Sequence, residues 1–495
     1  MDLGNLASLR LFLPELLLIA GVLTIIVLDL LLAGGSLLGE LSLIITACAL
    51  LLVAEAPHAA GDWLFNRMLV DDGFGFFFRV LIILSAIVAL WMSIGSDEVK
   101  VCEQGEYYAI LLAATVAMIL MAESNNLLMA YLALELVSLT SYVLTGILRD
   151  NRRSQEAALK YLIYGGVASG MMIYGMSWIF GLAGSLDFSV INRALFMTRD
   201  APALAIFIAV VLILSGMGYK IASVPFHMWA PDVYEGAPIP ITTFLAIGSK
   251  AAGFALLTRF FYPAISHLTA SGRWQALSNV DWPQLLVVVC AITMTLGNLA
   301  ALQQDNLKRM LAYSSIAQAG YALLGFVLLS NDGVRAMLVY LFAYYLMDAG
   351  AFVVVMIVAN ATGREDIGAY RGLAARGGVW PAIALTVFLL SLTGIPATVG
   401  FIGKFYVFAA AIRQQFYILA VIGILNSVVS LYYYMRPVKA MFLEAPEPDA
   451  APFTAEMWNY GLMGALTIAT IGFGLYPPPV LDFAERSLRF FSGQS

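Results

Sequence analysis

The chain has 495 residues, of which 61% are hydrophobic and only 12% are charged, and its formal net charge is −6 at pH 7. Soluble domains average about 45–50% apolar and about 25% charged residues, so this composition excludes a soluble globular protein and favours one that buries its surface in a bilayer. The sequence has neither a basic block nor a basic aromatic stripe, which argues against nucleic acid as a partner.

Apolar runs long enough to cross a bilayer recur along the whole chain. The first run could be read as a cleaved signal peptide, but it is long, contains Glu15 and Asp29, and lacks a small-residue cleavage site. These features favour a retained helix. The runs predict an all-α, polytopic membrane protein with about fourteen helices, at residues 11–31, 36–54, 74–95, 107–122, 127–148, 159–183, 203–224, 240–262, 283–302, 310–329, 335–360, 379–412, 416–440 and 457–476.

The Lys and Arg residues in the predicted loops indicate the orientation of the chain. An even number of helices places both termini on one side, and the loops on the other side carry a modest excess of basic residues. The clusters Arg149–Arg153 and Lys308–Arg309 supply most of that excess. Both termini are therefore predicted to lie outside.

Two of the predicted helices contain a break. Pro225 ends one spanning run and is followed by a second short apolar stretch, and Pro396 lies inside the run 379–412, which is too long for one simple crossing. Proline removes a backbone donor, and the freed groups are tolerated at membrane depth only where protein or a wet cavity satisfies them. Two broken helices, each near a lysine, are typical of a repeated transporter unit. A pair of kinked packing helices is the alternative interpretation.

Four charged residues lie deep in apolar runs, namely Glu135, Lys220, Lys250 and Lys404. Lys250 is about ten residues into its helix, which corresponds to a depth of roughly 15 Å at 1.5 Å per residue. Its side chain is too short to bring the ammonium group to either surface. Intramembrane charges of this kind mark proton or ion pathways, and a row of ammonium groups would repel metal cations, so we expect protons to be the transported species. Structural buried ion pairs are the alternative.

Other polar residues give weaker signals. His227, Asp348 and Lys308 are secondary relay candidates. Glu15, Arg79 and Arg259 also lie in or near apolar runs, whereas Glu123 is expected to be merely interfacial. The isolated cysteines, the three scattered histidines and the absence of a phosphate-binding glycine motif predict no cofactor or metal site in this chain.

Several segments resemble the proton-antiporter-like family, and most closely the N-type membrane subunits of bacterial NADH–quinone oxidoreductase, respiratory complex I. The most specific segment is SVPFHMWAPDVYEGAPIPITTFLAIGSKAAGF (Ser223–Phe254). The others are LLMAYLALELVSLTSYVL around Glu135, NLKRMLAYSSIAQAGY (Asn306–Tyr321) and SLTGIPATVGFIGKF (Ser391–Phe405). Together they cover the chain from about residue 107 to residue 412. Gln318 stands where many relatives have His, and Asp348 is not part of the familiar pattern.

The resemblance implies two inverted five-helix repeats, each with one discontinuous helix. Residues 1–106 would form three N-terminal helices, residues 107–262 the first repeat, residues 283–440 the second repeat, and residues 441–495 a last helix and tail. Glu135 and Lys220 match the coupling pair of the first repeat. Lys250 matches the central lysine, and Lys404 matches the lysine of the second broken helix.

The function that the resemblance implies is proton translocation in the membrane arm of NADH:quinone oxidoreductase, in the bacterial inner membrane with periplasmic termini. NADH, flavin, iron–sulfur clusters and quinone would be bound by partner subunits, and the contacts of this chain would be sister antiporter-like subunits, lipids and protons. Two rival functions remain, namely an Mrp-type cation/proton antiporter subunit and a purely structural membrane scaffold.

Overall fold

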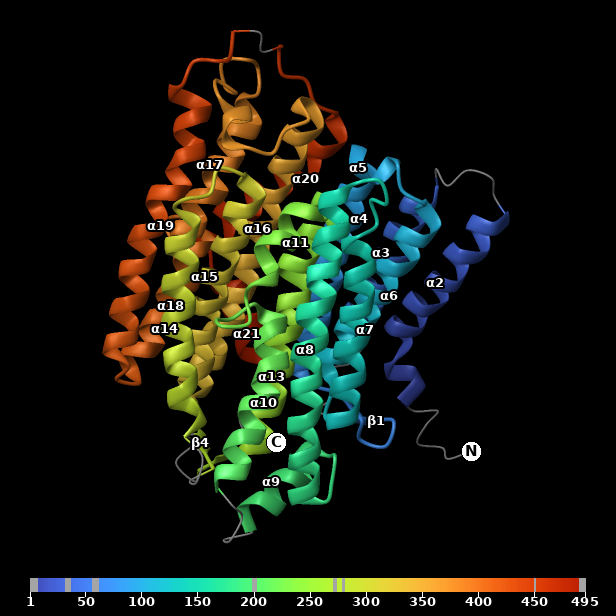
Figure 1. Ribbon diagram of the computed structural model, residues 1–495, viewed down its shortest axis with the longest axis vertical. Helices are drawn as coiled ribbons and strands as arrows, with labels where there is room; N and C mark the ends of the chain where they lie inside the picture. Colours follow the sequence, from blue (N-terminus) through green and yellow to red (C-terminus); the bar gives the residue numbers. More distant parts are fainter. Residues whose placement is uncertain are drawn as a thin grey trace.

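The computed structural model describes residues 8–31, 37–55, 62–197, 203–269, 274–277, 281–448 and 451–488. Within these ranges the protein is a bundle of long helices whose axes run mostly along its longest dimension (Figure 1), with α2 at one edge and α19 at the other. Both chain termini lie outside the described residues.

The first half of the described chain contains the helices α2 (Leu13–Leu31), α3 (Leu38–Glu55), α4 (Gly73–Ile94), α5 (Asp97–Lys100), α6 (Gln104–Glu123), α7 (Leu127–Thr145), α8 (Arg152–Ala183), α9 (Phe188–Met197), α10 (Ala203–Ile221), α11 (Trp229–Gly236), α12 (Ile239–Phe244), the π-helical segment η1 (Leu245–Ser249) and α13 (Lys250–Ile265). The second half contains α14 (Trp282–Ala301), α15 (Leu307–Val327), α16 (Asn331–Thr362), the 3₁₀ segment η2 (Ile367–Tyr370), α17 (Val379–Thr393), α18 (Val399–Arg413), α19 (Tyr417–Leu443), α20 (Met457–Leu475) and α21 (Pro478–Arg486).

The predicted polytopic all-α class is confirmed. In the described part of the chain, 12 helices are long and apolar enough to cross a membrane, or up to 13 if the bent pair α20–α21 is one span. The run predicted at 379–412 is divided into α17 and α18, each of 15 residues. Each of the fourteen predicted runs therefore has a helical counterpart.

One local prediction differs from the structure, and two local elements were not predicted. The helix expected at 159–183 begins at Arg152, because the Asn151 side chain caps it by accepting a hydrogen bond from the Arg153 amide. Arg152 and Arg153, expected in a loop, are thus helical. The sequence also gave no indication of two short antiparallel hairpins, β1 (Asp62–Leu64) with β2 (Leu69–Asp71) and β3 (Ser266–Leu268) with β4 (Trp274–Ala276).

Matched local features recur in the two halves. Asn126 and Asn306 cap α7 and α15, and both form an isolated bridge to an aspartate, Asp187 or Asp366. The following helices, α8 and α16, have 32 residues each and both end at a glycine in the left-handed conformation. If each repeat holds five spans, corresponding helices cross the membrane in opposite directions. These features support inverted repeats, while the boundaries 107–262 and 283–440 stay predictions.

Both halves also contain a helix that is interrupted at a proline. Between α10 and α11 the chain passes Pro225, which follows a cis peptide bond, and between α17 and α18 it passes Pro396. A non-glycine residue with positive φ stands in each interruption, Ala222 at 57° and Ala397 at 71°. Such φ values are uncommon for alanine, so both interruptions hold locally strained backbone.

Candidate functional site

Lys250 begins α13 at the point where the π-helical segment η1 ends. Single π-helical turns frequently mark functional positions in helices. The Lys250 side chain is only 1% exposed. Its Nζ donates a hydrogen bond of 2.7 Å to the main-chain oxygen of Ser315 and also contacts the Ser315 hydroxyl. The central lysine is therefore held by α15, a helix that is itself almost completely buried.

Ser315 connects Lys250 to a buried acid. The Ser315 hydroxyl lies 2.7 Å from the hydroxyl of Tyr344, and Tyr344 donates a hydrogen bond of 3.0 Å to Asp348 one turn further along α16. Tyr234 reaches the same serine hydroxyl at 3.1 Å. Asp348 is completely buried, so this acid faces Lys250 through two hydroxyl groups. The structure thus brings Asp348, predicted as a secondary relay, into the cluster around the central lysine.

A second set of polar contacts leads from this cluster along α15. Ser314 hydrogen-bonds to the hydroxyl of Tyr434, and Gln318 donates to the same hydroxyl at 3.1 Å. The Gln318 oxygen accepts a hydrogen bond from Tyr340, and its Nε2 donates to the main-chain oxygen of Leu392 at 3.2 Å. Gln318 therefore reaches from the centre of the protein to the end of α17.

Lys404 lies at that end. Its Nζ donates to the main-chain oxygens of Leu392 (2.9 Å) and Thr393 (3.0 Å) and to the Ser427 hydroxyl (2.9 Å). The interruption after Thr393 leaves these carbonyl groups without helical partners. The ammonium group also lies 4.4 Å from the centroid of the Tyr321 ring, within the range of a cation–π contact. Lys404 and Gln318 thus share the Leu392 oxygen as an acceptor.

Lys220 lies in the last turn of α10, and its side chain packs against α13 at Gly253. A Cβ built on Gly253 would lie 3.4 Å from Lys220 Cγ, and Gly253 follows Lys250 by one helical turn. The Lys220 ammonium is buried and has no hydrogen-bond partner among the described residues. The ammonium group can therefore donate a hydrogen bond to a group on a neighbouring helix.

Glu135 is half-buried on α7, and its Oε1 is a buried atom without a hydrogen-bond partner among the described residues. Glu135 and Lys220 form no direct ion pair among the described residues, but the carboxylate lies close enough to act electrostatically on the ammonium group. The resemblance implies them as a coupling pair, and that assignment stays a prediction.

The other two relay candidates occupy different settings. His227 follows the break after α10, is 5% exposed, and has an Nδ1 atom without a partner in the described part of the chain. Lys308 is 1% exposed and is held by Glu365 at 2.9 Å and by the main-chain oxygen of Ala237 at 2.8 Å. Lys308 therefore lies in the first turn of α15 as a charge that is already paired.

Sequence reasoning missed the hydroxyl groups that connect the lysines. Ser315, Tyr344 and Tyr434 lie in apolar helices where serine and tyrosine are ordinary residues. One signal was present, because Tyr344 and Asp348 are four residues apart and side chains at that spacing share a helix face.

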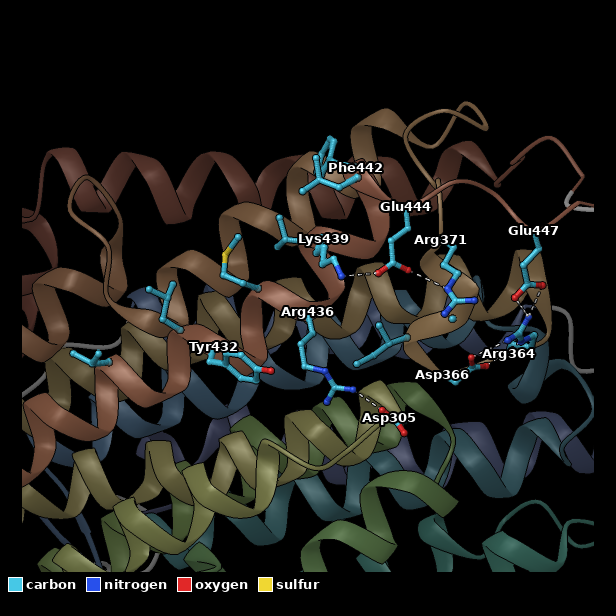
Figure 2. Close-up of a pocket in the computed structure, with 17 residues that line it drawn as sticks. Asp305, Arg364, Asp366, Arg371, Tyr432, Arg436, Lys439, Phe442, Glu444 and Glu447 are labelled. Atoms are coloured by element: carbon cyan, nitrogen blue, oxygen red, sulfur yellow. Dashed lines mark hydrogen bonds and ion pairs between the residues drawn. The ribbon is translucent and has the colours of Figure 1, made fainter.

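A large cavity lies elsewhere, at one end of α19. Figure 2 shows this cavity, of about 1230 Å³, with acidic and basic side chains around it. Its charges are paired, for example Arg436 with Asp305 at 2.5 Å and Arg371 with Glu444 at 3.0 Å. The four predicted proton-carrying residues, Glu135, Lys220, Lys250 and Lys404, do not line this cavity, so the cavity is separate from them.

Among the described residues, no group of three or more His, Cys, Asp or Glu side chains is arranged to hold a metal ion. The polar row is made of amines, hydroxyls, an amide and buried carboxylates. Hydroxyl groups both donate and accept hydrogen bonds, so this chemistry is suited to passing protons.

Comparisons with known proteins show which family this chain and its fold resemble. Residues 124–430 match the family model described as NADH:quinone oxidoreductase/Mrp antiporter, transmembrane. NADH-quinone oxidoreductase subunit N of Chlorobium chlorochromatii is 46% identical over 99% of this chain and 96% of its own length. A chain of respiratory complex I from Thermus thermophilus is 30% identical with a TM-score of 0.78, covering 95% of this chain and 98% of that one. A chain of the Mrp complex from Dietzia, 19% identical, shares the fold with a TM-score of 0.80 over 100% of this chain and 99% of its own.

Proposed function

The chain belongs to the NADH:quinone oxidoreductase/Mrp antiporter family as a proton-translocating membrane subunit of the oxidoreductase, and we propose that its protons move along the row Glu135, Lys220, Lys250 and Lys404. Other membrane subunits of the complex are its partners. The single observation that supports the row most strongly is that two sets of hydrogen bonds meet at neighbouring residues of α15. Lys250 donates to Ser315, and Ser314 is connected through Tyr434 and Gln318 to the Leu392 oxygen that also accepts from Lys404.

Proton loading would begin in the first half. The Lys220 ammonium group and the Glu135 Oε1 atom have no hydrogen-bond partner among the described residues. A buried ammonium group is stabilised by a carboxylate that approaches it and destabilised when the carboxylate leaves. Movement that brings Glu135 toward Lys220 would therefore load a proton on the lysine, and movement apart would pass it on to Lys250.

Proton transfer in the second half would use the hydroxyl groups on α15, α16 and α19. Lys250 can give its proton to the serine–tyrosine contacts that end at Asp348, which acts as a local acceptor. Gln318 orients the hydroxyls of Tyr340 and Tyr434 between Lys250 and Lys404. We assign Gln318 a positioning role, because an amide is a poor proton carrier at neutral pH.

The energy for this transfer would come from partner subunits. NADH, flavin, iron–sulfur clusters and quinone are assigned to those partners, because no redox motif is present in this sequence. We further propose that the complex lies in the bacterial inner membrane, with both termini of this chain on the periplasmic side, as the basic loop clusters favour.

The substitution Gln318→Leu tests the row in the assembled complex. Leucine fills a similar volume but cannot orient the tyrosine hydroxyls, so we expect fewer protons translocated per electron in reconstituted vesicles. Gln304→Leu is the matched control, because the Gln304 side chain hydrogen-bonds only to the Ala300 oxygen of α14 among the described residues. Equal proton translocation by both variants would contradict the proposed path. Sodium-dependent transport by the isolated chain would instead favour the antiporter function.

A further inference from the structure

A cluster of buried charges lies where α2, α4 and α6 meet the hairpin strand β2. The guanidinium group of Arg79 contacts three carboxylates: Glu15 at 2.9 Å, Asp71 at 3.4 Å, and Glu123. Glu15 and Glu123 are 0% exposed, and Arg79 is 1% exposed. Glu123, expected from the sequence to be merely interfacial, is thus completely buried.

Two fully buried glutamates, Glu15 and Glu123, share the guanidinium group of Arg79. The adjacent basic group, Arg259, is already engaged, because it forms two hydrogen bonds of 2.6 Å to Asp72 and a third to a main-chain oxygen. That pair packs against the cluster, since a Cβ on Gly75 would lie 3.2 Å from Arg259 and 3.4 Å from Glu123 Cγ. If both glutamates were ionised, one guanidinium group would face two fully buried carboxylates in a site without solvent.

Hydrogen-bond geometry shows which polar atoms of this cluster have no partner. Arg79 Nε lies 2.7 Å from Glu123 Oε1 and 2.9 Å from Glu15 Oε1. This nitrogen carries a single hydrogen, and the hydrogen points to Glu123. Both carboxylate oxygens of Glu15, Oε2 of Glu123, and Nη1 and Nη2 of Arg79 are buried without a hydrogen-bond partner among the described residues. Two fully buried acids that share one guanidinium group cannot both remain ionised at low cost.

We infer that Glu15 and Glu123 together hold one exchangeable proton beside Arg79, at a site separate from the lysine row. The one guanidinium group that both glutamates contact cannot neutralise two fully buried carboxylates, and a proton on either glutamate removes the excess charge. The N-terminal end of a helix stabilises a carboxylate and the C-terminal end destabilises one. Glu15 lies in the first turn of α2 and Glu123 at the C-terminal end of α6, so Glu123 holds the larger share of the proton.

A metal cation fits this site less well than a proton. Hard cations bind through several oxygens that converge on one point. Here the carboxylates surround a guanidinium group, which would repel a cation, and the described residues hold no metal-binding group of His, Cys, Asp or Glu. Among the described residues, the charged groups that face the Glu15–Glu123 pair are Arg79 on α4, Asp71 on β2, and Arg259 with Asp72 beside them.

Infrared spectroscopy of the purified complex tests the inference without relying on proton translocation. We expect the carbonyl band of one protonated carboxylic acid to be present in the wild type and absent from both Glu15→Gln and Glu123→Gln, because either change leaves only one of the two fully buried glutamates, which then ionises against Arg79. Glu103→Gln is the control: Glu103 is exposed at the other end of α6, and this variant should keep the band. Titration to alkaline pH should remove the same band from the wild type.

The variants should also assemble normally, since the amide resembles the protonated acid. Wild-type intensity of the band in both Gln variants would overturn the inference, and so would failure of both variants to assemble when Glu103→Gln assembles. Loss of proton translocation with an unchanged band would count against the inferred proton pair but leave the lysine row intact. A band that disappears only when sodium is added would show that the site holds a metal cation instead.

Discussion

Lys404 has a structural role that can be separated from its proposed role in proton transfer. Its ammonium group donates to the Thr393 oxygen, and no other hydrogen bond to that oxygen is present in the described part of the chain. The neighbouring Leu392 oxygen has a second donor in Gln318. Replacing Lys404 with methionine would therefore leave one buried carbonyl group without a partner.

The structure sets the size of this effect. A buried, unsatisfied polar group costs about 1–3 kcal/mol, so Lys404→Met should destabilise the subunit by about that amount. Lys404→Gln keeps an N–H donor near the same carbonyls and should lose less. Neither methionine nor an amide takes up a proton near neutral pH. Both variants should therefore lose proton translocation, although they differ in stability.

Thermal inactivation of the purified complex measures the structural part, and proton uptake by reconstituted vesicles during NADH oxidation measures the transfer part. We expect Lys404→Met to inactivate at a lower temperature than Lys404→Gln, and both to move fewer protons per electron than the wild type. Wild-type proton translocation by a normally assembled Lys404→Gln complex would refute the reasoning.

Three further predictions concern particular contacts. Gly394→Ala should destabilise the subunit by about 1–2 kcal/mol, because φ at this position is +97°, and unchanged thermal inactivation of the complex would contradict this. Arg259→Met should cost about 3–5 kcal/mol by leaving the buried Asp72 without its cation, which is measured as less assembled subunit in membranes. The hydrogen bond from Arg364 holds the pKa of Asp366 below its usual range, so this carboxylate stabilises the fold above the unfolded-state pKa and loses that effect as pH falls through the lowered one. Asp366→Asn should therefore lower thermal stability at neutral pH and make no difference in strong acid.

The helices could be predicted from the sequence because each apolar run has the length that a bilayer requires. The start of α8 was missed because its bounds were predicted from hydrophobicity alone. The first turn of α8 is polar, and the helix begins where the Asn151 side chain caps it. The hairpins β1–β2 and β3–β4 were missed because three-residue strands are too short for a periodic pattern.

The site was only partly predictable. Lys220, Lys250 and Lys404 are visible in the sequence because ammonium groups are rare in apolar helices. The contacts between helices are a different matter, since nothing in the sequence shows that Ser315 faces Lys250 or that Gln318 reaches the end of α17. Glu123 was misjudged for a similar reason: it is the last residue of α6, and only the packing of α2 and α4 reveals that this helix end is covered.

The central claim is that protons pass through the charged row of this chain. Glu135→Gln in the assembled complex tests it most directly, because Glu135 forms no ion pair among the described residues, so the variant should fold and assemble normally. The measurement is the number of protons translocated per electron, together with the rate of NADH-driven quinone reduction. A proton pathway through this row predicts that both values fall below those of the wild type. Unchanged values in a fully assembled Glu135→Gln complex would contradict the claim and favour a scaffold.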